Sequence, residues 1–587
     1  MLRLLACWFV TVAMSMLLLL VATTATNALT VYTVNGHVTD IATGLPIQGV
    51  CIIIGPPAAC PPTAPISNAN GDWTTQLIDG STWDVWYSKI GYNLVKDTIP
   101  ASIPSNPVVL NKQLTSNGQV PPGSCPAPTV GTPTQSVYLP NITKTLGGAT
   151  GFQTPFIVQN TSTTTATNLE VTFYKFSDGS CVTRRTVTAL AGGTSFADVP
   201  NNDADLPDDS QFSVVVRSFG ARIVSVVNEH AGFGVRAEAL SYDGFSSGAT
   251  TVSLPNIVRR FFGYHTPFII QNLGTLPTTA TASFLPFGGG PAVTVQRTIA
   301  PGQSQFIEPN VEPVLTDGKQ YGVTVTATQP IAVVVNTHND APTVANPVAY
   351  SADGIAVGGN TLYAPYFAKN ASRVGVSTMV VQNVGSGPAT PSLKFTPLGG
   401  GNATTLSLGS VNASNSVAFD PRYTNGNTAQ PLCGAAASPG CLADGEYTVE
   451  VSAGGGTTAA AVSVIGTASA MGYTALTQAT PKYFLPNVTR TLGGVDGWTT
   501  PILLQSTTAT TATLAWYRFT DGVLVTSQSV ALTPGSGVRI DPRSVPGLTD
   551  DTQYAVVATG SGNIAAIVVE LATGGDNAMI YEGFPSP

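Results

Sequence analysis

The stretch Thr154-Pro-Phe-Ile-Val-Gln-Asn160 recurs along the chain and decides the fold. Its other copies are Thr266-Pro-Phe-Ile-Ile-Gln-Asn272, Ser377-Thr-Met-Val-Val-Gln-Asn383 and Thr500-Pro-Ile-Leu-Leu-Gln-Ser506. Their glutamines are 112, 111 and 123 residues apart. Each copy is a short apolar run that ends in a polar side chain, which is typical of a β-strand. Self-similarity at a nearly fixed period predicts tandem structural repeats.

Three further landmarks recur with the same period. A segment predicted to start a strand precedes each copy, as Leu139-Pro-Asn141, Leu254-Pro-Asn256, Leu485-Pro-Asn487 and, more weakly, Ala364-Pro-Tyr366. A turn with aspartate follows each copy and starts at Leu206, Leu315, Leu442 and Leu548. A closing segment ends each unit, as Tyr242-Asp-Gly-Phe245, Ser351-Ala-Asp-Gly354, Gly472-Tyr473 and Tyr581-Glu-Gly-Phe584. The predicted repeats are 136–247, 248–358, 359–478 with a cysteine-bearing insertion, and 479–587.

The repeat length selects the architecture. About 110 residues of strand and turn fit an immunoglobulin-like sandwich of roughly seven strands, whereas a propeller blade needs only about 40–50 residues. No window after the N-terminal segment has a sustained helical period. The pattern resembles β-sandwich repeats of bacterial extracellular and cell-surface proteins, which implies an exposed β-module and no particular reaction.

Residues 29–115 form a separate unit. It contains Asn35-Gly-His-Val-Thr-Asp-Ile-Ala-Thr-Gly-Leu-Pro-Ile-Gln-Gly-Val-Cys-Ile52, Asn68-Ala-Asn-Gly-Asp-Trp73 and Lys89-Ile-Gly-Tyr92. These landmarks resemble the carboxypeptidase regulatory-like domain, a small transthyretin-like sandwich, which implies an accessory module without catalytic residues. A proline-rich linker, 116–135, follows. The predicted fold class is therefore all-β: a signal peptide, a transthyretin-like β-sandwich and four tandem immunoglobulin-like β-sandwich repeats.

Residues 1–28 have the pattern of a secretory signal. Arg3 precedes an apolar run from Leu4 to Val21, and small residues follow. This order predicts cleavage near Ala25 or Ala28, while an uncleaved anchor is the alternative reading, because the run is about 18 residues long. No later segment is apolar enough to span a membrane. A secreted or cell-surface location is expected.

Composition excludes several classes of function. Only 10% of the 587 residues are charged and the formal net charge is -8, which argues against nucleic acid because that partner needs a basic surface. Four histidines leave few general bases or metal ligands. We find no catalytic or cofactor-binding constellation, and the chain is predicted not to be an enzyme.

Six cysteines remain after the signal. Cys51 with Cys60 and Cys433 with Cys441 are close in sequence, and Cys125 and Cys181 are left over. An oxidising compartment favours disulfides between these pairs, but spacing alone leaves 15 pairings open, and unpaired buried thiols are the other reading.

Two weaker patterns are candidate ligand sites. Asp203, Asp205 and Asp208 offer oxygen ligands for Ca²⁺, although the EF-hand pattern fails and a solvated acidic loop is the preferred reading. His230 and His338 occupy corresponding places in repeats 1 and 2 and are interpreted as ordinary polar residues at strand ends. No other cofactor is expected.

Trp73, Trp83 and Trp86 are candidate contacts for a glycan in the first domain. Strand alternation puts Trp83 and Trp86 on opposite faces, so the three rings do not form one platform. In a sandwich this small, tryptophan more often fills the core.

The leading hypothesis is a non-catalytic structural or adhesive protein, an elongated row of five sandwiches at the cell surface. Its expected partners are other envelope or extracellular proteins and, because low charge favours edge-to-edge association, a second copy of itself. The alternative is a carbohydrate-binding accessory protein, with polysaccharide as partner.

Overall fold

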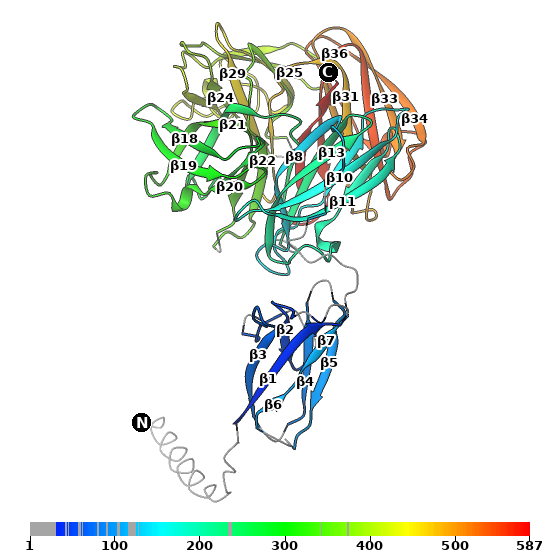
Figure 1. Ribbon diagram of the computed structural model, residues 1–587. Coiled ribbons are helices and arrows are strands. Elements are labelled where there is room, and N and C mark those ends of the chain that lie inside the picture. The colour runs from blue at the N-terminus through cyan, green and yellow to red at the C-terminus, as the bar shows by residue number, and fades with distance from the viewer. Residues whose placement is uncertain are drawn as a thin grey trace, which may run out of the picture. The chain divides into compact units, whose positions relative to one another are not determined.

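The computed structural model describes residues 31–586 except 42–43, 45, 57–59, 62, 79–80, 90–91, 103–105, 116–124, 127, 233–236, 342 and 372–374. The predicted signal segment lies outside the described residues. The chain divides into unit 1, residues 1–121, and unit 2, residues 122–587 (Figure 1). Both are built from strands, which confirms the all-β prediction. In the described part, none of the helical segments has the length and apolarity that a bilayer crossing requires.

Unit 1 is a sandwich of two sheets. One sheet contains β1 (Val31–Asp40), β3 (Asp72–Ile78), β6 (Val108–Val109) and β7 (Lys112–Leu114). The other contains β2 (Cys51–Ile54), β4 (Trp83–Ser88) and β5 (Val95–Ile99). Val34, Val38, Val85 and Tyr87 are buried between the sheets. The carboxypeptidase regulatory-like assignment of this sandwich stays a prediction.

Unit 2 contains the four repeats, each an antiparallel sandwich. In repeat 1, one sheet has the order β11-β10-β13-β8 and the other β12-β9-β14-β15. The bounds are β8 (Gln135–Lys144), β9 (Phe156–Asn160), β10 (Thr167–Lys175), β11 (Cys181–Leu190), β12 (Ser195–Asp198), β13 (Ser210–Phe219), β14 (Ile223–Ala231) and β15 (Glu238–Asp243), with the 3-10 turn η1 (Pro200–Asn202).

The other repeats have the same strand sequence. Repeat 2 contains β16 (Ala249–Arg259), β17 (Phe268–Asn272), β18 (Thr278–Pro286), β19 (Val293–Ile299), β20 (Ser304–Ile307), η3 (Pro309–Val311), β21 (Lys319–Asn339) and β22 (Val348–Asp353). Repeat 3 contains β23 (Thr361–Lys369), β24 (Val376–Asn383), β25 (Ser392–Pro397), β26 (Thr404–Ser407), β27 (Ser416–Phe419), η4 (Thr424–Gly426), β28 (Gly445–Ser452), β29 (Thr458–Ile465) and β30 (Ala470–Thr474). Repeat 4 contains β31 (Thr480–Arg490), β32 (Ile502–Ser506), β33 (Thr510–Arg518), β34 (Leu524–Leu532), β35 (Gly537–Ile540), η5 (Pro542–Ser544), β36 (Thr552–Leu571), β37 (Ala578–Glu582) and β38 (Phe584–Pro585).

The Leu-Pro-Asn segments lie inside strands, so the prediction that they start strands is wrong. The pairing register shifts between Leu254 and Ile257 and between Leu485 and Val488. Proline lacks the N–H that a regular ladder needs and is tolerated at such a bulge. A tyrosine of the closing strand holds the bulge, because the hydroxyl of Tyr242 donates to the carbonyl of Asn141 at 2.7 Å. Tyr581 and Asn487 form the same bond at 2.8 Å.

The four repeats close into a ring, so the expected elongated row is wrong for unit 2. The closing strands β15, β22, β30 and β37 pack side by side in that order, and β37 packs back against β15. In Figure 1, repeat 4 (orange to red) accordingly lies beside repeat 1 (cyan). The closing strands therefore surround a pseudo-fourfold axis.

One type of interface joins all neighbouring repeats. The first strand of each repeat packs against the Gln-Asn strand of the next: β8 on β17, β16 on β24, β23 on β32 and β31 on β9. The recurrent glutamines are buried there, and the Nε2 atoms of Gln382 and Gln505 donate to the carbonyls of Val323 and Val449 in the preceding repeats, at 3.4 and 3.2 Å. Apolar residues also cross between repeats, since Ile157 and Val226 of repeat 1 belong to the core of repeat 4.

Candidate functional site

The closing strands place one equivalent residue from each repeat at the axis. These residues are Asp243, Asp353, Thr474 and Glu582. Each comes directly after one aligned position of its closing strand, and these positions are Tyr242, Ala352, Tyr473 and Tyr581 in the same order. Oxygen atoms of the three carboxyl groups lie within 4.8 Å of one another. Tandem repetition and ring closure thus bring together acidic residues more than 300 positions apart in the sequence.

Contacts around the axis run from repeat to repeat in one direction. The carboxyl group of Asp353 lies against the backbone amide of Asp243, whose own carboxyl group lies against that of Glu582. Glu582 accepts a hydrogen bond from the backbone N–H of Thr474. The hydroxyl of Thr474 donates to the carbonyl of Asp353 at 2.9 Å and closes the circle.

Burial dominates the protonation of this cluster. It raises the pKa of Asp243 and of Asp353 well above the usual range, and the neighbouring carboxyl groups raise both further. Burial also raises the pKa of Glu582. Burial of an uncompensated carboxylate favours its protonated form, so the shifts of all three carboxyl groups have the same direction.

Asp576 of repeat 4 forms hydrogen bonds to each of the other three repeats. Its carboxyl oxygens accept the N–H groups of Ala349 in repeat 2 at 2.6 Å and Ala470 in repeat 3 at 2.8 Å. Its own N–H donates to the carbonyl of Ala237 in repeat 1 at 3.1 Å. The residue has no exposed surface, and burial raises its pKa to about 8.

Two interfaces carry a matching buried amide and carboxyl network. Glu570 of repeat 4 accepts from Asn487 Nδ2 of its own repeat at 2.8 Å and from Asn228 Nδ2 of repeat 1 at 2.7 Å. Glu229 of repeat 1 accepts in the same way from Asn141 and, in repeat 2, from Asn336. Burial raises the pKa of Glu570 to about 8 and of Glu229 to about 7, although the amide donors oppose both shifts.

The interface between repeats 3 and 4 replaces this network with apolar contacts. Val464 stands at the position of the glutamate and Val569 at that of the second asparagine, and both belong to one core cluster. An amide facing valine would lose its hydrogen bonds in a buried site. These matched pairs therefore favour one order of the repeats around the ring.

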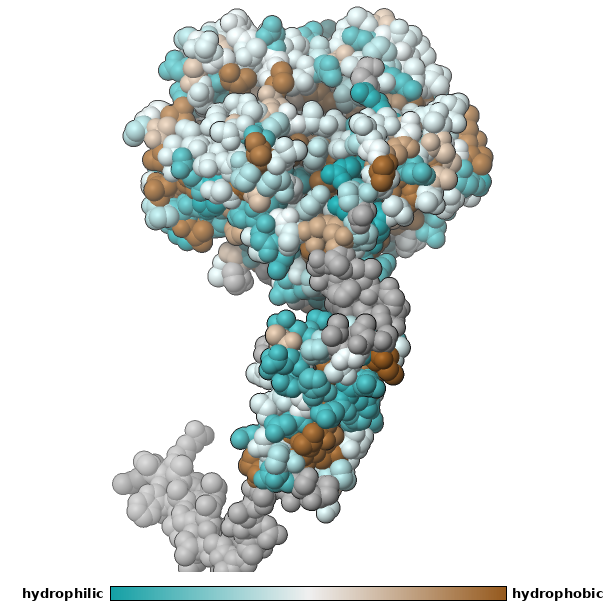
Figure 2. Space-filling view, viewed as in Figure 1, coloured by the Kyte–Doolittle hydropathy of each residue, from teal (hydrophilic) through white to brown (hydrophobic). Residues whose placement is uncertain are grey.

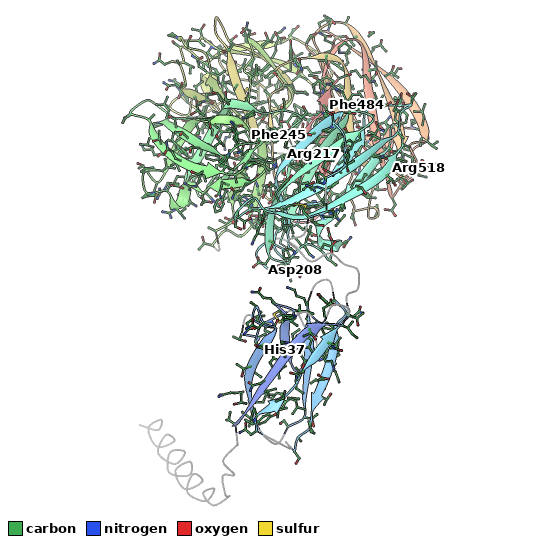
Figure 3. All side chains as sticks on the ribbon, viewed as in Figure 1. His37, Asp208, Arg217, Phe245, Phe484 and Arg518 are labelled. Carbon is green, nitrogen blue, oxygen red and sulfur yellow. A yellow bond between two sulfur atoms is a disulfide. The ribbon has the colours of Figure 1, made fainter. Side chains whose placement is uncertain are left out.

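The ammonium group of Lys144 lies beside two of the predicted Ca²⁺ ligands, Asp203 and Asp208. The ammonium of Lys144 donates to the carbonyls of Asp203 and Leu206 at 2.7 and 2.8 Å and lies 3.1 Å from Asp208. Asp203 also pairs with Arg185 at 2.7 Å. Asp208 is exposed at one end of repeat 1, where Figure 3 labels it. Asp205 contributes its N–H to the side chain of Asp203, and its half-buried side chain is not part of a converging cluster within the described residues.

The tryptophans of unit 1 do not share one exposed surface. Trp73 is 5% exposed and packs edge-on against Tyr87 in the core, which corrects its proposed role as a glycan contact. Trp83 and Trp86 are half-buried on opposite faces of β4, and Lys96 lies over the ring of Trp86.

The structure contains the disulfides Cys51–Cys60, Cys125–Cys181 and Cys433–Cys441.

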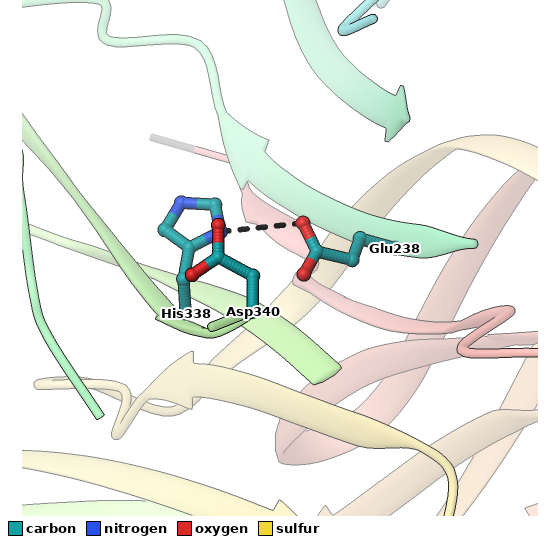
Figure 4. Close-up of side chains that lie close together, drawn as sticks. All are labelled: Glu238, His338 and Asp340. Carbon is teal, nitrogen blue, oxygen red and sulfur yellow. Dashed lines mark ion pairs between the residues drawn. The ribbon is translucent and has the colours of Figure 1, made fainter. Parts of the chain in front are cut away.

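A second cluster lies where repeats 1 and 2 meet. Glu238 at the start of β15 faces His338 near the end of β21, and Asp340 follows β21 (Figure 4). Sequence reasoning missed it, because it weighed His338 alone and gave Glu238 and Asp340 no role. The adjacent His265 lies between Glu308 and Asp340. Burial alone would lower the pKa of His265, but hydrogen bonds to Asp340 and Glu308 raise it to about 9.

No protein-family model matches the sequence, and no curated protein does. Several solved structures are similar to the chain at low identity. The structure of Thermotoga maritima 1070 is 18% identical and covers 18% of this chain and 93% of its own, with a TM-score of 0.16. The RrgB pilus protein of Streptococcus pneumoniae is 9% identical and covers 76% and 93%, with a TM-score of 0.17.

A third similar structure is BcpA, the major pilin subunit of Bacillus cereus, which is 9% identical, covers 72% of this chain and 95% of its own, and has a TM-score of 0.12. Structural neighbours thus include pilin subunits. Scores this low describe no common arrangement of domains, so the function is argued from the geometry of this chain.

Proposed function

We propose that the protein is secreted and acts outside the cell as a non-catalytic adhesive scaffold, with the ring of unit 2 as a rigid platform for multivalent binding. Ring closure is the observation that supports this proposal, because repeats arranged around one axis present equivalent loops at the same end. Several weak contacts made together give far greater avidity than one. The three disulfides fit an oxidising compartment.

The loops that follow the first strands are the proposed contact surface. They leave those strands through the same left-handed turn, with φ of 46°, 48°, 49° and 48° at Thr145, Arg260, Asn370 and Thr491. Apolar side chains stand out from two of them, since Phe262 is 85% exposed and Val495 is 89% exposed. In the proposed mode of binding, a partner that spans the ring contacts both side chains at once.

The remaining surface suits a polar, weakly charged partner. The face of unit 2 in Figure 2 shows mainly residues of intermediate hydropathy, with separate hydrophilic and hydrophobic spots. Envelope proteins and neutral polysaccharides are partners of this chemistry. A second copy of the chain is a further candidate partner.

The test measures binding of the purified full chain to cell envelopes of the producing organism. The double variant Phe262→Ser, Val495→Ser is expected to bind about tenfold more weakly, because two of the equivalent contacts are lost. Leu276→Ser is the matched control: Leu276 is 61% exposed but follows the opposite end of β17. Unchanged binding of the double variant, or an equal loss in the control, would contradict the proposed surface.

A further inference from the structure

We propose that Glu238, His338 and Asp340 form a binding site for one Zn²⁺-like transition-metal ion, which joins repeat 1 to repeat 2. Glu238 comes from repeat 1, while His338 and Asp340 come from repeat 2. In Figure 4 the imidazole and the two carboxyl groups converge on one small region. A metal there would bridge two repeats.

The distances suit ligands of a metal better than hydrogen-bond partners. One ligand atom from each residue lies within 4.8 Å of the others. The Nδ1 atom of His338 is 3.6 Å from Glu238 Oε2, which is beyond hydrogen-bond range. Two ligands that each bind Zn²⁺ at about 2.0–2.2 Å are themselves separated by roughly 3.3–3.6 Å in tetrahedral geometry.

Both interior ligands have unsatisfied polar atoms. His338 is 8% exposed and Glu238 is 6% exposed. Within the described part of the chain, His338 Nδ1 and Glu238 Oε1 have no hydrogen-bond partner. Leaving a buried polar atom unpaired costs about 1–3 kcal/mol, and a bound cation would satisfy both atoms at once.

Neighbouring side chains hold the ligands in place. The His265 ring lies 3.2 Å from Asp340 through Nε2 and 3.2 Å from Glu308 through Nδ1. The His338 ring packs between Phe152 and His265, with centroids 5.7 and 5.5 Å away. Side chains that hydrogen-bond to metal ligands or pack against them in this way orient the ligands and support their affinity for the metal.

The ligand chemistry selects the class of ion. One imidazole nitrogen and two carboxylate oxygens suit Zn²⁺ and similar borderline divalent ions. Ca²⁺ prefers six to eight oxygen ligands, which this set does not supply. Asp340 is on the solvent side, so an ion can enter there and a water can complete the coordination.

Repeat 1 provides an internal comparison. His230 occupies the position of His338, but Gly232 replaces Asp340, and repeat 4 contributes Asn577 where repeat 1 contributes Glu238. The His230 ring instead packs against Trp498, with centroids 5.2 Å apart. His230→Ala is therefore a matched control that removes a half-buried histidine at the equivalent position without removing a proposed ligand.

The test uses the untagged full chain after metal removal, titrated with Zn²⁺ by calorimetry and with Co²⁺ by visible absorption. One ion per chain and the intense bands of four-coordinate Co²⁺ are expected. His338→Ala, Glu238→Gln and the solvent-side variant Asp340→Asn should each weaken Zn²⁺ binding at least about tenfold. Asp340→Asn guards against a folding defect, because its side chain is 46% exposed.

His230→Ala should bind Zn²⁺ as the unmodified chain does. The proposal is overturned if the unmodified chain binds no Zn²⁺, if all three ligand variants keep full affinity, or if His230→Ala loses the ion equally. Preferential binding of Ca²⁺ at the same residues would also contradict the assignment.

Discussion

Asp576→Ala is expected to lower the free energy of unfolding of unit 2 by about 2–6 kcal/mol at pH 7. The substitution leaves the N–H groups of Ala349 and Ala470 without acceptors, and each such buried group costs about 1–3 kcal/mol. Because those groups belong to repeats 2 and 3 while Asp576 belongs to repeat 4, the loss falls on the interfaces between repeats. Chemical denaturation of the full chain, followed by circular dichroism, measures it.

Two further variants make this result specific. Asp576→Asn keeps one acceptor oxygen and should lose about half as much stability as Asp576→Ala. Asp521→Ala removes an exposed aspartate that pairs with Arg518 and should change stability little, because solvent screens such a surface pair. A loss in Asp576→Ala no larger than that of Asp521→Ala would show that Asp576 does not hold the repeats together.

The free energy of unfolding of unit 2 is expected to fall as pH rises from about 6.5 to 7.5, and Glu570 and Asp576 together contribute roughly 2 kcal/mol of this fall. Burial raises the folded-state pKa of both Glu570 and Asp576 to about 8. Their pKa values in the unfolded chain are about 4. Between these limits only the folded state carries the two protons, and each proton changes stability by about 1.4 kcal/mol per pH unit.

The sign is unambiguous in this window. A carboxyl group with a raised folded-state pKa stabilises the fold below its unfolded pKa, and the contribution is lost as pH rises towards the folded value. His230 acts in the opposite sense, because burial lowers its pKa to about 4. Its effect is confined to pH values below about 6.5, the pKa of an unfolded histidine.

Denaturation at several pH values in the presence of EDTA checks this prediction. The double variant Glu570→Gln, Asp576→Asn should show a smaller decline between pH 6.5 and 7.5 than the unmodified chain, even if it is less stable overall. Part of the decline stays, because burial also raises the pKa values of Glu229 and Glu582. A stability that is constant or rises across this window in the unmodified chain would contradict the assigned burial of these two carboxyl groups.

The fold class was predictable because its signals are local. The Gln-Asn strand recurs in every repeat, with Ser506 in place of the asparagine in the last. The asparagine side chain donates to nearby backbone carbonyls, as Asn272 does to those of Leu276 and Ile299 at 2.8 and 3.0 Å. Ring closure was not predictable in this way. Its contacts join residues such as Asn228 and Glu570, 342 positions apart, and no local pattern specifies such a pair.

The ring explains part of the low charge content of the chain. Neutral polar residues also lie inside the ring, because Gln271, Gln382 and Gln505 are buried where repeats meet. Charged residues at these positions would need partners that a β-sandwich interface rarely supplies. Association between sandwiches, expected between copies of the chain, takes place inside unit 2 among its own repeats.

A signal for the axial cluster was present in the sequence. Asp243, Asp353 and Glu582 follow aligned positions in the closing segments, and residues at equivalent positions converge where the strands that carry them line the axis of a ring. The Zn²⁺ site gave no comparable signal, because Glu238 has no counterpart of the same type in the other repeats. It depends on side chains from two repeats that meet only after folding.

Small-angle X-ray scattering of unit 2 tests the closed ring most directly. A compact body of this length has a radius of gyration of about 23 Å, whereas four such sandwiches in a row would give roughly 40 Å. The ring predicts the smaller value, together with a pair-distance distribution that has a single maximum. The larger value, with an extended tail of long distances, would contradict the closure of repeat 4 onto repeat 1.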